Sequence, residues 1–238
     1  VDDAMSGVDY VFHAAALKQV PTCEFFPMQA TQTNVIGSRN VIDSAISHRV
    51  ANVVSLSTDK AVYPVNALGI TKALMEKVVE ASARNLGEGE TVLTVVRYGN
   101  VLFSRGSVIP LFMKQIRENN AISVTEPEMT RFLLPLKEAI DLVAFALEKG
   151  RQGDIFVRKA PSCLVGDLAQ AVKNIFRSNS EIKTIGMRHG EKMYETLASK
   201  GELLRSEDMG NYLRISIDDR DLNYNKYLNE GDIEIIKT

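Results

Sequence analysis

Thr58, Asp59 and Lys60 are the residues whose types and spacing could most directly do chemistry. They place a hydroxyl, a carboxylate and an amine at successive positions of the chain. A carboxylate and an ammonium group that lie together can hold their pKa values apart, as one pocket requires for acid and base chemistry. Lys72 follows a little further along and adds a second amine. The alternative is a set of solvated charges without a function.

The neighbouring elements decide where these groups lie. Residues 53–57 form an apolar, β-branched run that predicts a buried parallel strand. Ligands of open α/β sheets bind beyond the carboxyl ends of the strands, so Thr58, Asp59 and Lys60 would emerge at that edge. A loop follows, and residues 67–85 predict a helix that carries the second lysine in its first turns.

Small side chains follow the first predicted strand of the chain. Ala14, Ala15 and Ala16 would let a flat ligand approach the backbone closely. Residues 17–21 are predicted to continue as a loop, in which Lys18 could reach a ribose or a phosphate. The alternative is that the small residues pack a helix against the sheet and that the lysine faces water.

Arg105 stands among glycine and serine residues immediately before a helix predicted at residues 108–118. This arrangement suits a phosphate, because arginine forks onto oxygens and free backbone N–H groups at a helix start add donors. The alternative is a surface loop in which the arginine pairs with a nearby carboxylate. Further possible anion contacts in the second half of the chain are Arg131, Arg188 and Lys192.

Strand and helix patterns alternate along the first half of the chain, which predicts parallel βαβ units. Strands are expected at residues 8–12, 53–57 and 91–96, with a crossover helix over residues 27–48. The second half changes to shorter elements. Helices are expected there at residues 137–149 and 165–177, and strands or extended segments at residues 122–125, 129–135, 154–157 and 181–186.

These patterns predict an α/β fold with a Rossmann-like, doubly wound parallel sheet and a smaller α+β lobe. Residues 1–120 would form a partial dinucleotide-binding domain. Residues 121–238 would form mainly a substrate-binding lobe, with some segments that return to the sheet. Residues 218–238 are polar and largely without periodicity, and are predicted to be a tail or part of the lobe.

Composition describes an ordinary globular protein. The chain has 238 residues, 45% hydrophobic and 24% charged, with a net charge of −2. This balance favours neither a nucleic acid nor an anionic membrane as a partner. Cys23 and Cys163 are far apart and have no metal-ligand spacing, which predicts free thiols and no metal site. No apolar run approaches the roughly 20 residues of a spanning helix, so we expect a cytoplasmic protein without membrane insertion.

The start of the chain is unusual for the predicted fold. Val1 is not a methionine, and no GxGxxG occurs in the sequence. A doubly wound domain normally opens with a strand and a glycine-rich turn that binds the pyrophosphate. We therefore expect the first βαβ unit to be missing from this sequence.

Several motifs occur together in a characteristic order: HAAALKQVP, NVIGSRN, LSTDKAVYP, GITK, RYGNV, SRGSVIPLF, MTRFLLPL, DIFVRKAP and RHGEKMYETL. Together they resemble the extended short-chain dehydrogenase/reductase superfamily. More narrowly, the chain resembles the inverting UDP-N-acetylglucosamine 4,6-dehydratases (5-epimerases) of bacterial capsule, O-antigen and flagellin-glycan biosynthesis. The resemblance extends over residues 8–228.

The resemblance implies a reaction that uses a bound nicotinamide cofactor, NADP or NAD. Oxidation at C4 of the sugar acidifies the C5 proton, a base removes that proton, and an acid protonates the departing C6 hydroxyl. The cofactor then reduces C6, and protonation of C5 from the opposite face inverts it. In the family the Asp and Lys of the TDK motif fill the acid and base roles, here Asp59 and Lys60. Retaining enzymes resemble TDE at this place, so Lys60 favours the inverting branch.

The same resemblance assigns contacts along the chain. Thr58 joins the catalytic residues, and no metal is implied. Cofactor contacts are expected at Ala14, Ala15, Ala16, Lys18, Asn34 and Lys72. Contacts with the UDP-sugar are expected at Asn100, Arg105, Ser107, Arg131, Arg188 and Glu191. Members of the family are similar to homo-oligomers, so a dimer or hexamer is expected.

One departure from the superfamily leaves a role open. Its YxxxK motif supplies a tyrosine that deprotonates the alcohol, and Lys72 matches the lysine, but Leu68 stands in place of the tyrosine. Thr58, Asp59 through a water, or Lys60 could remove the C4 hydroxyl proton, and Tyr63 is near in sequence. The alternatives to inverting dehydration are a sugar-nucleotide epimerase, a retaining dehydratase, or an inactive UDP-sugar-binding protein.

Overall fold

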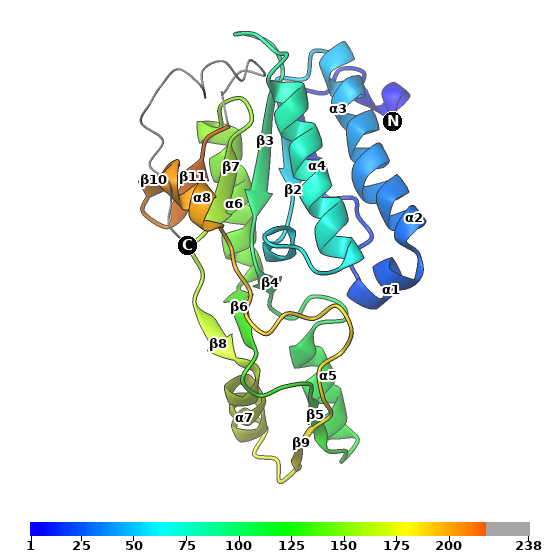
Figure 1. Cartoon of the computed structure of the whole chain (residues 1–238), viewed down its shortest axis with the longest axis vertical. Helices are drawn as coiled ribbons and strands as arrows, with labels where there is room; N and C mark the ends of the chain where they lie inside the picture. Colours follow the sequence, from blue (N-terminus) through cyan, green and yellow to red (C-terminus); the bar gives the residue numbers. More distant parts are fainter. Residues whose placement is uncertain (218–238) are drawn as a thin grey trace, which may run out of the picture.

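The computed structural model describes residues 1–217, and its largest element is a six-stranded sheet of order β1-β2-β3-β7-β11-β10 (Figure 1). The first four strands are parallel, and β11 and β10 add an antiparallel edge. The predicted α/β fold with a mostly parallel sheet is confirmed. In sheet order the strands are β1 (Tyr10–His13), β2 (Asn52–Leu56), β3 (Val92–Arg97), β7 (Ile155–Arg158), β11 (Tyr212–Ile215) and β10 (Ser206–Met209).

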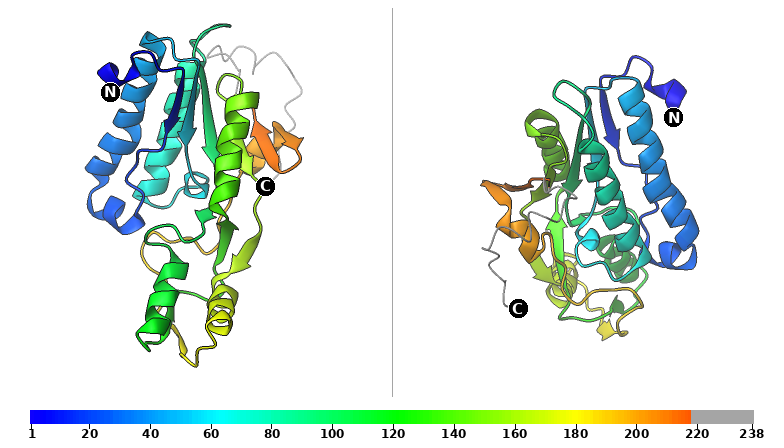
Figure 2. Two further views of the ribbon diagram at one scale, coloured as in Figure 1. Left: turned by 180° about the vertical axis from the view of Figure 1, so that it is seen from behind. Right: turned by 45° about the horizontal axis from the view of Figure 1, so that its top comes forward.

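Helices cover both faces of this sheet (Figure 2). Helices α3 (Gly37–Ser47) and α4 (Ala67–Ala83) lie on one face, and α6 (Leu136–Lys149) lies on the other. Successive side chains of a strand point to opposite faces. Accordingly, Val53 packs in the core with α3 and α4, whereas Val54 packs in the core with α6. Burial on both faces explains why β2 and β3 read as continuous apolar runs.

The crossover between β1 and β2 differs from the sequence expectation in two ways. The predicted loop of residues 17–21 ends early, because Val20 and Pro21 begin helix α1 (Val20–Phe25). Proline suits a first helical turn, where its missing N–H would have no partner within the helix. The single helix expected over residues 27–48 is instead built from α2 (Pro27–Thr31), a π-helical segment (Gln32–Ile36) and α3.

A smaller lobe lies beyond the carboxyl ends of the parallel strands (Figure 1). It contains the sheets β4-β6-β8 and β5-β9, packed with helices α5 (Val108–Arg117) and α7 (Val165–Ile175) around their own apolar core. The sequence patterns missed β4 and β8, which are too short to show a period. The strands are β4 (Asn100–Val101), β5 (Ile122–Val124), β6 (Thr130–Leu134), β8 (Ser162–Leu164) and β9 (Ile182–Thr184).

The chain passes between the two parts repeatedly. The large sheet takes β7, β11 and β10 from the second half of the sequence, and the small lobe takes β4 and α5 from the first half. The domain division at residue 120 therefore stays a prediction, and the predicted tail at residues 218–238 lies outside the described residues. A short helix, α8 (Lys200–Leu204), precedes β10. Within residues 1–217, no helix is long and apolar enough to cross a membrane.

Candidate active site

A cleft of about 470 Å³ lies between the carboxyl edge of the large sheet and the small lobe. Ala14, Ser57 and Tyr98 line it from the segments that directly follow β1, β2 and β3. Ser107 and Arg131 line it from the small lobe. The cleft is thus at the strand edge where the sequence predicted chemistry.

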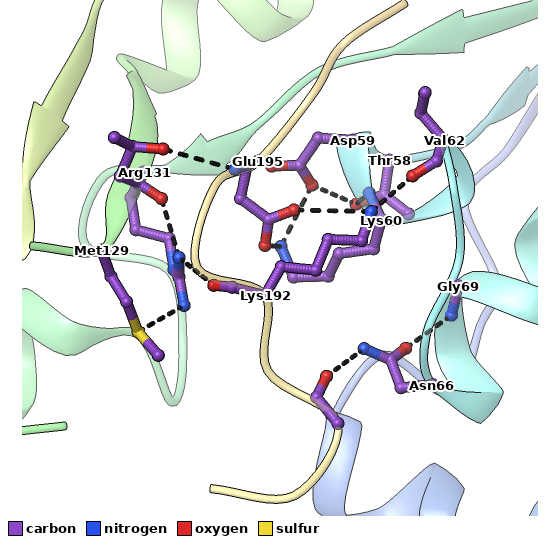
Figure 3. A network of polar contacts seen from close by, with 12 residues as sticks. Thr58, Asp59, Lys60, Val62, Asn66, Gly69, Met129, Arg131, Lys192 and Glu195 are labelled. Atoms are coloured by element: carbon purple, nitrogen blue, oxygen red, sulfur yellow. Dashed lines mark hydrogen bonds and ion pairs between the residues drawn. The ribbon is translucent and has the colours of Figure 1, made fainter. Parts of the chain in front are cut away.

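A tight turn after β2 holds the central residues of the site (Figure 3). Thr58 caps a 3₁₀ turn (Asp59–Ala61), and its Oγ1 donates to Asp59 Oδ1 at 2.8 Å. The ammonium group of Lys60 also donates to Asp59 Oδ1, at 3.0 Å. Asp59 is fully buried, and its Oδ2 has no hydrogen-bond partner among the described residues. Thr58 and Lys60 line the cleft, whereas Asp59 lies behind them.

Glu195 joins this cluster, and the sequence analysis did not single it out. Its Oε1 lies 3.5 Å from Lys60 Nζ, and its Oε2 lies 3.9 Å from Lys192 Nζ. Its backbone N–H donates to Thr130 Oγ1 at 3.3 Å. The motif RHGEKMYETL contains Glu195, but nothing in its local pattern indicates a partner as distant in sequence as Lys60.

The pKa values of the two amines in the cluster, Lys60 and Lys192, are shifted in opposite directions. Burial acts to lower the pKa of Lys60, but the carboxylates of Asp59 and Glu195 outweigh it, and the pKa rises above its usual value. Burial lowers the pKa of Lys192, although Glu195 and Asp59 oppose the change. Lys60 is therefore an amine that keeps its proton at neutral pH and can donate it.

Lys72 also lines the cleft and has a different environment from that of Lys60. Its Nζ donates to the backbone oxygen of Leu56 at 2.8 Å and lies 3.5 Å from Met75 Sδ. Burial lowers the pKa of Lys72 to about 8, against the opposing charge of Glu76. Since its charge is only weakly compensated by protein groups, Lys72 is suited to a ligand with hydroxyl or anionic groups.

Of the other residues expected to contact the cofactor, some line the cleft and some do not. Ala14, Ala16 and Lys18 line the cleft, and Ala15 does not. Asn34 lies behind the loop: its Oδ1 accepts from the backbone N–H of Leu17 at 2.8 Å, and its Nδ2 donates to the Leu17 oxygen at 3.0 Å. Asn34 therefore holds the loop that carries the lining residues.

The residues expected at the UDP-sugar all line the cleft: Asn100, Arg105, Ser107, Arg131, Arg188 and Glu191. The Asn100 Oδ1 and Ser107 Oγ atoms are buried and have no hydrogen-bond partner among the described residues. Buried polar atoms normally have partners, so two such atoms on a cleft wall indicate a place for a polar ligand.

Leu68 lines the cleft where the superfamily motif has tyrosine, and it packs with the buried Cys23 and Ala30. It offers no group that could take a proton. Tyr63 does not replace it, because its side chain is exposed and its hydroxyl accepts from the backbone N–H of Lys200 at 3.3 Å. Tyr63 is not among the residues that line the cleft. In the part of the chain that the structure describes, no group of three His, Cys, Asp or Glu side chains could hold a metal ion.

The doubly wound sheet and the cleft at its carboxyl edge define a Rossmann-type protein. Residues 1–217 match the family model described as polysaccharide biosynthesis protein, and the chain belongs to that family. A UDP-glucose 4-epimerase of Rickettsia felis is 58% identical over 235 residues, which are 99% of this chain and 69% of the relative. The expected membership in a family of polysaccharide biosynthesis proteins is thereby confirmed. Membership in the narrower group of inverting 4,6-dehydratases stays a prediction.

Solved structures share the fold. The X-ray structure of Pen from Bacillus thuringiensis is 40% identical, with a TM-score of 0.86 over 90% of this chain and 68% of that chain. DesIV, a dTDP-glucose 4,6-dehydratase from Streptomyces venezuelae with NAD and TYD bound, is 20% identical. Its TM-score is 0.75 over 83% of this chain and 67% of that chain. The likeness to DesIV shows the fold alone.

Proposed function

We propose that the protein is a nicotinamide-dependent enzyme of polysaccharide biosynthesis that dehydrates UDP-N-acetylglucosamine across C4 to C6 and inverts C5. The observation that carries the proposal is the buried cluster in which Lys60 lies between Asp59 and Glu195. Dehydration with inversion moves protons at C5 and at the C4 and C6 hydroxyls, and a cluster of amines and carboxylates can serve several such transfers. The relative from Rickettsia felis, named as acting on a UDP-sugar, supports this substrate class.

Three residues that line the cleft, Ala14, Ala16 and Lys72, fit a nicotinamide cofactor, NADP or NAD. The small side chains of Ala14 and Ala16 leave room for a flat ring, and the amine of Lys72 can donate to ribose hydroxyls. DesIV, which shares the fold, has NAD bound. The cofactor supplies the reversible oxidation of a sugar carbon, and the protein residues supply binding and proton transfer.

Thr58 and Asp59 can together remove the C4 hydroxyl proton, which is the role of the tyrosine that Leu68 replaces. The Thr58 hydroxyl lines the cleft and donates to Asp59 Oδ1, so a proton from the C4 hydroxyl can pass through Thr58 to the carboxylate. Lys60 starts with a proton and can give it to the departing C6 hydroxyl. The neutral Lys60 amine that this leaves can take up the C5 proton, so that Asp59 and Lys60 each accept one proton.

The experiment is turnover of UDP-N-acetylglucosamine by the purified protein in deuterated water, with NADP or NAD supplied. We expect a 4-keto-6-deoxy product, inverted at C5 and carrying deuterium there, as read by nuclear magnetic resonance. A product that retains its original C5 hydrogen would overturn the proposal. Binding of the UDP-sugar without any product would indicate a binding protein instead.

The second candidate is 4-epimerisation of a UDP-sugar, which the name of the relative from Rickettsia felis favours. That reaction needs proton exchange only at the C4 hydroxyl and leaves the C5–H bond intact. Conversion of UDP-glucose to its C4 epimer, without loss of water and without deuterium at C5, would establish it over dehydration.

A further inference from the structure

We propose that Glu195 is a positioning residue for Lys60: from the segment between β9 and α8 it holds the ammonium group against Asp59 and stabilises its protonated form. The catalytic consequence rests on the proposed function, because it concerns the proton that Lys60 donates. The state of Lys60 itself can be measured without any turnover.

The geometry places Lys60 between two buried carboxylates. Its Nζ lies 3.0 Å from Asp59 Oδ1 and 3.5 Å from Glu195 Oε1. The side chains of Asp59 and Glu195 are 0% and 3% exposed, and that of Lys60 is 18% exposed. Water screens charges poorly in such a place, so each carboxylate acts strongly on the amine. Figure 3 shows both carboxylates directed at Lys60.

The other charges that face Lys60 are positive. The Arg131 guanidinium donates to the backbone oxygens of Thr130 and Lys192 at 2.7 and 3.1 Å. These two acceptors are neutral, so the positive charge of Arg131 is not cancelled by them. That charge acts to lower the pKa of Lys60. Lys192 donates to the backbone oxygen of Val62 and lies near Glu195 Oε2. Without Glu195, the Lys60 ammonium would face two other cations with Asp59 as its remaining counter-ion.

Contacts before Glu195 fix its segment to the large part of the molecule. Asn66 Nδ2 donates to the backbone oxygen of Gly190 at 2.6 Å, and the Lys192 amine binds Val62. Both partners belong to the stretch that connects the Lys60 turn with α4. The segment is thereby held against the turn that it completes.

Contacts after Glu195 fix the segment a second time. Arg97, at the end of β3, donates to the backbone oxygen of Leu197 at 3.0 Å and pairs with Glu202 at 3.0 Å. The same guanidinium pairs with Glu76 of α4 at 2.6 Å, and it is 2% exposed. Anchored on both sides, Glu195 can hold the Lys60 ammonium at a constant place.

The experiment measures the titration of the Lys60 amine in the purified protein. Brief exposure to acetic anhydride at a series of pH values acetylates only neutral amines, and mass spectrometry quantifies the modified Lys60 peptide. An opposite charge at this distance shifts a pKa by about 1 unit or more. We therefore expect Glu195→Gln to lower the midpoint of Lys60 by about 1 pH unit. Glu181→Gln, at an exposed carboxylate of the small lobe, should leave it unchanged.

A second variant protects the test against misfolding. Glu195→Asp keeps the charge but draws it away from Lys60, so a smaller downward shift is expected; circular dichroism reports folding of each variant. An unchanged midpoint in both variants would overturn the proposal.

Turnover gives an independent readout. The alkaline limb of the kcat profile should move to lower pH in Glu195→Gln, because Lys60 loses its proton earlier, while KM changes little. A protein without turnover in which the midpoint still shifts would contradict the proposed function but not this inference. Turnover of the substrate together with an unshifted Lys60 midpoint in Glu195→Gln would contradict this inference but not the proposed function.

Discussion

Lys60 and Lys72 have the same side chain, but their surroundings shift their pKa values in opposite directions. Burial acts to lower the pKa of both. Lys60 contacts two carboxylates and its pKa rises, whereas Lys72 donates to a neutral backbone oxygen and a thioether and its pKa falls to about 8. Lys60 is suited to donate a proton in the proposed reaction, and Lys72 is suited to bind a ligand.

Lys60 should be indispensable, whereas Leu68 should not. Lys60→Ala removes the amine and leaves two carboxylates facing a cavity, so we expect turnover to fall by at least about 10²-fold, the range of a lost acid or base. Leu68→Tyr adds a phenol to the cleft wall and should retain activity. Steady-state rates of both variants check this, and an equal loss in the two would contradict these roles.

Thr58 should matter through its hydroxyl alone. Thr58→Val keeps the size of the side chain but removes the donor to Asp59 Oδ1, so kcat should fall by about 10²-fold if the hydroxyl relays a proton. Thr58→Ser restores the hydroxyl and should recover most of the rate. Initial rates at saturating substrate measure the difference. Similar rates in the valine and serine variants would exclude the relay.

At the scale of elements, the start of α4 supports the turn that carries Lys60. Asn66 caps the helix by accepting from the Gly69 N–H at 2.8 Å. A Cβ added at Gly69 would lie 2.2 Å from the backbone oxygen of Lys60, which shows how closely the two backbones approach. Only glycine permits this contact, and the position of Lys60 depends on it.

Gly69→Ala should therefore reduce both stability and activity. The methyl group must push the Lys60 turn away from α4, at a cost of about 1–3 kcal/mol in the free energy of unfolding. Gly37→Ala is the matched control, since its Cβ would meet nothing closer than 3.4 Å in α3. It should be neutral or stabilising by up to about 1 kcal/mol. Urea denaturation and turnover measure both effects, and equal stability of the two variants would contradict the prediction.

At the scale of the whole molecule, buried charged and polar groups join segments that are remote in sequence. Arg97 connects α4 and α8 through Glu76 and Glu202. His13, at the end of β1, is buried and its Nε2 lies 2.8 Å from Ser38 Oγ. Burial and the charge of Lys72 lower the pKa of His13 to about 4. The folded protein thus resists protonation of this imidazole.

His13 should make stability fall in acid. Its pKa is about 4 when folded and near 6.5 when unfolded, so the unfolded state binds more protons between these values. Its contribution to the free energy of unfolding, up to about 3 kcal/mol, is present above pH 6.5 and is lost as pH falls towards 4. His13→Gln removes this titration and should show a flatter dependence. Urea denaturation from pH 7 to 4 checks this, and parallel curves would contradict it.

Local patterns were enough for most elements that pack the large sheet. The apolar runs before Thr58 and Arg97 predicted β2 and β3 to within one residue, because parallel strands buried on both faces have a distinctive composition. Short elements were missed: β4, β8, α8 and the β10-β11 edge carry too few residues to show a period. The break of the crossover helix at residues 32–36 also left no local signal.

The sequence by itself determined the α/β class, the carboxyl edge as the place of the candidate site, and the turn in which Thr58, Asp59 and Lys60 stand together. These features follow from periodicity and adjacency in the sequence. Only the tertiary structure brought Glu195 to Lys60, placed Asn34 behind the loop that carries Ala16 and Lys18, and joined Arg97 to Glu202. Such contacts depend on where the chain crosses between the two lobes. The two partners of each contact lie in segments that are far apart in the sequence. A pattern within one segment therefore cannot predict the contact.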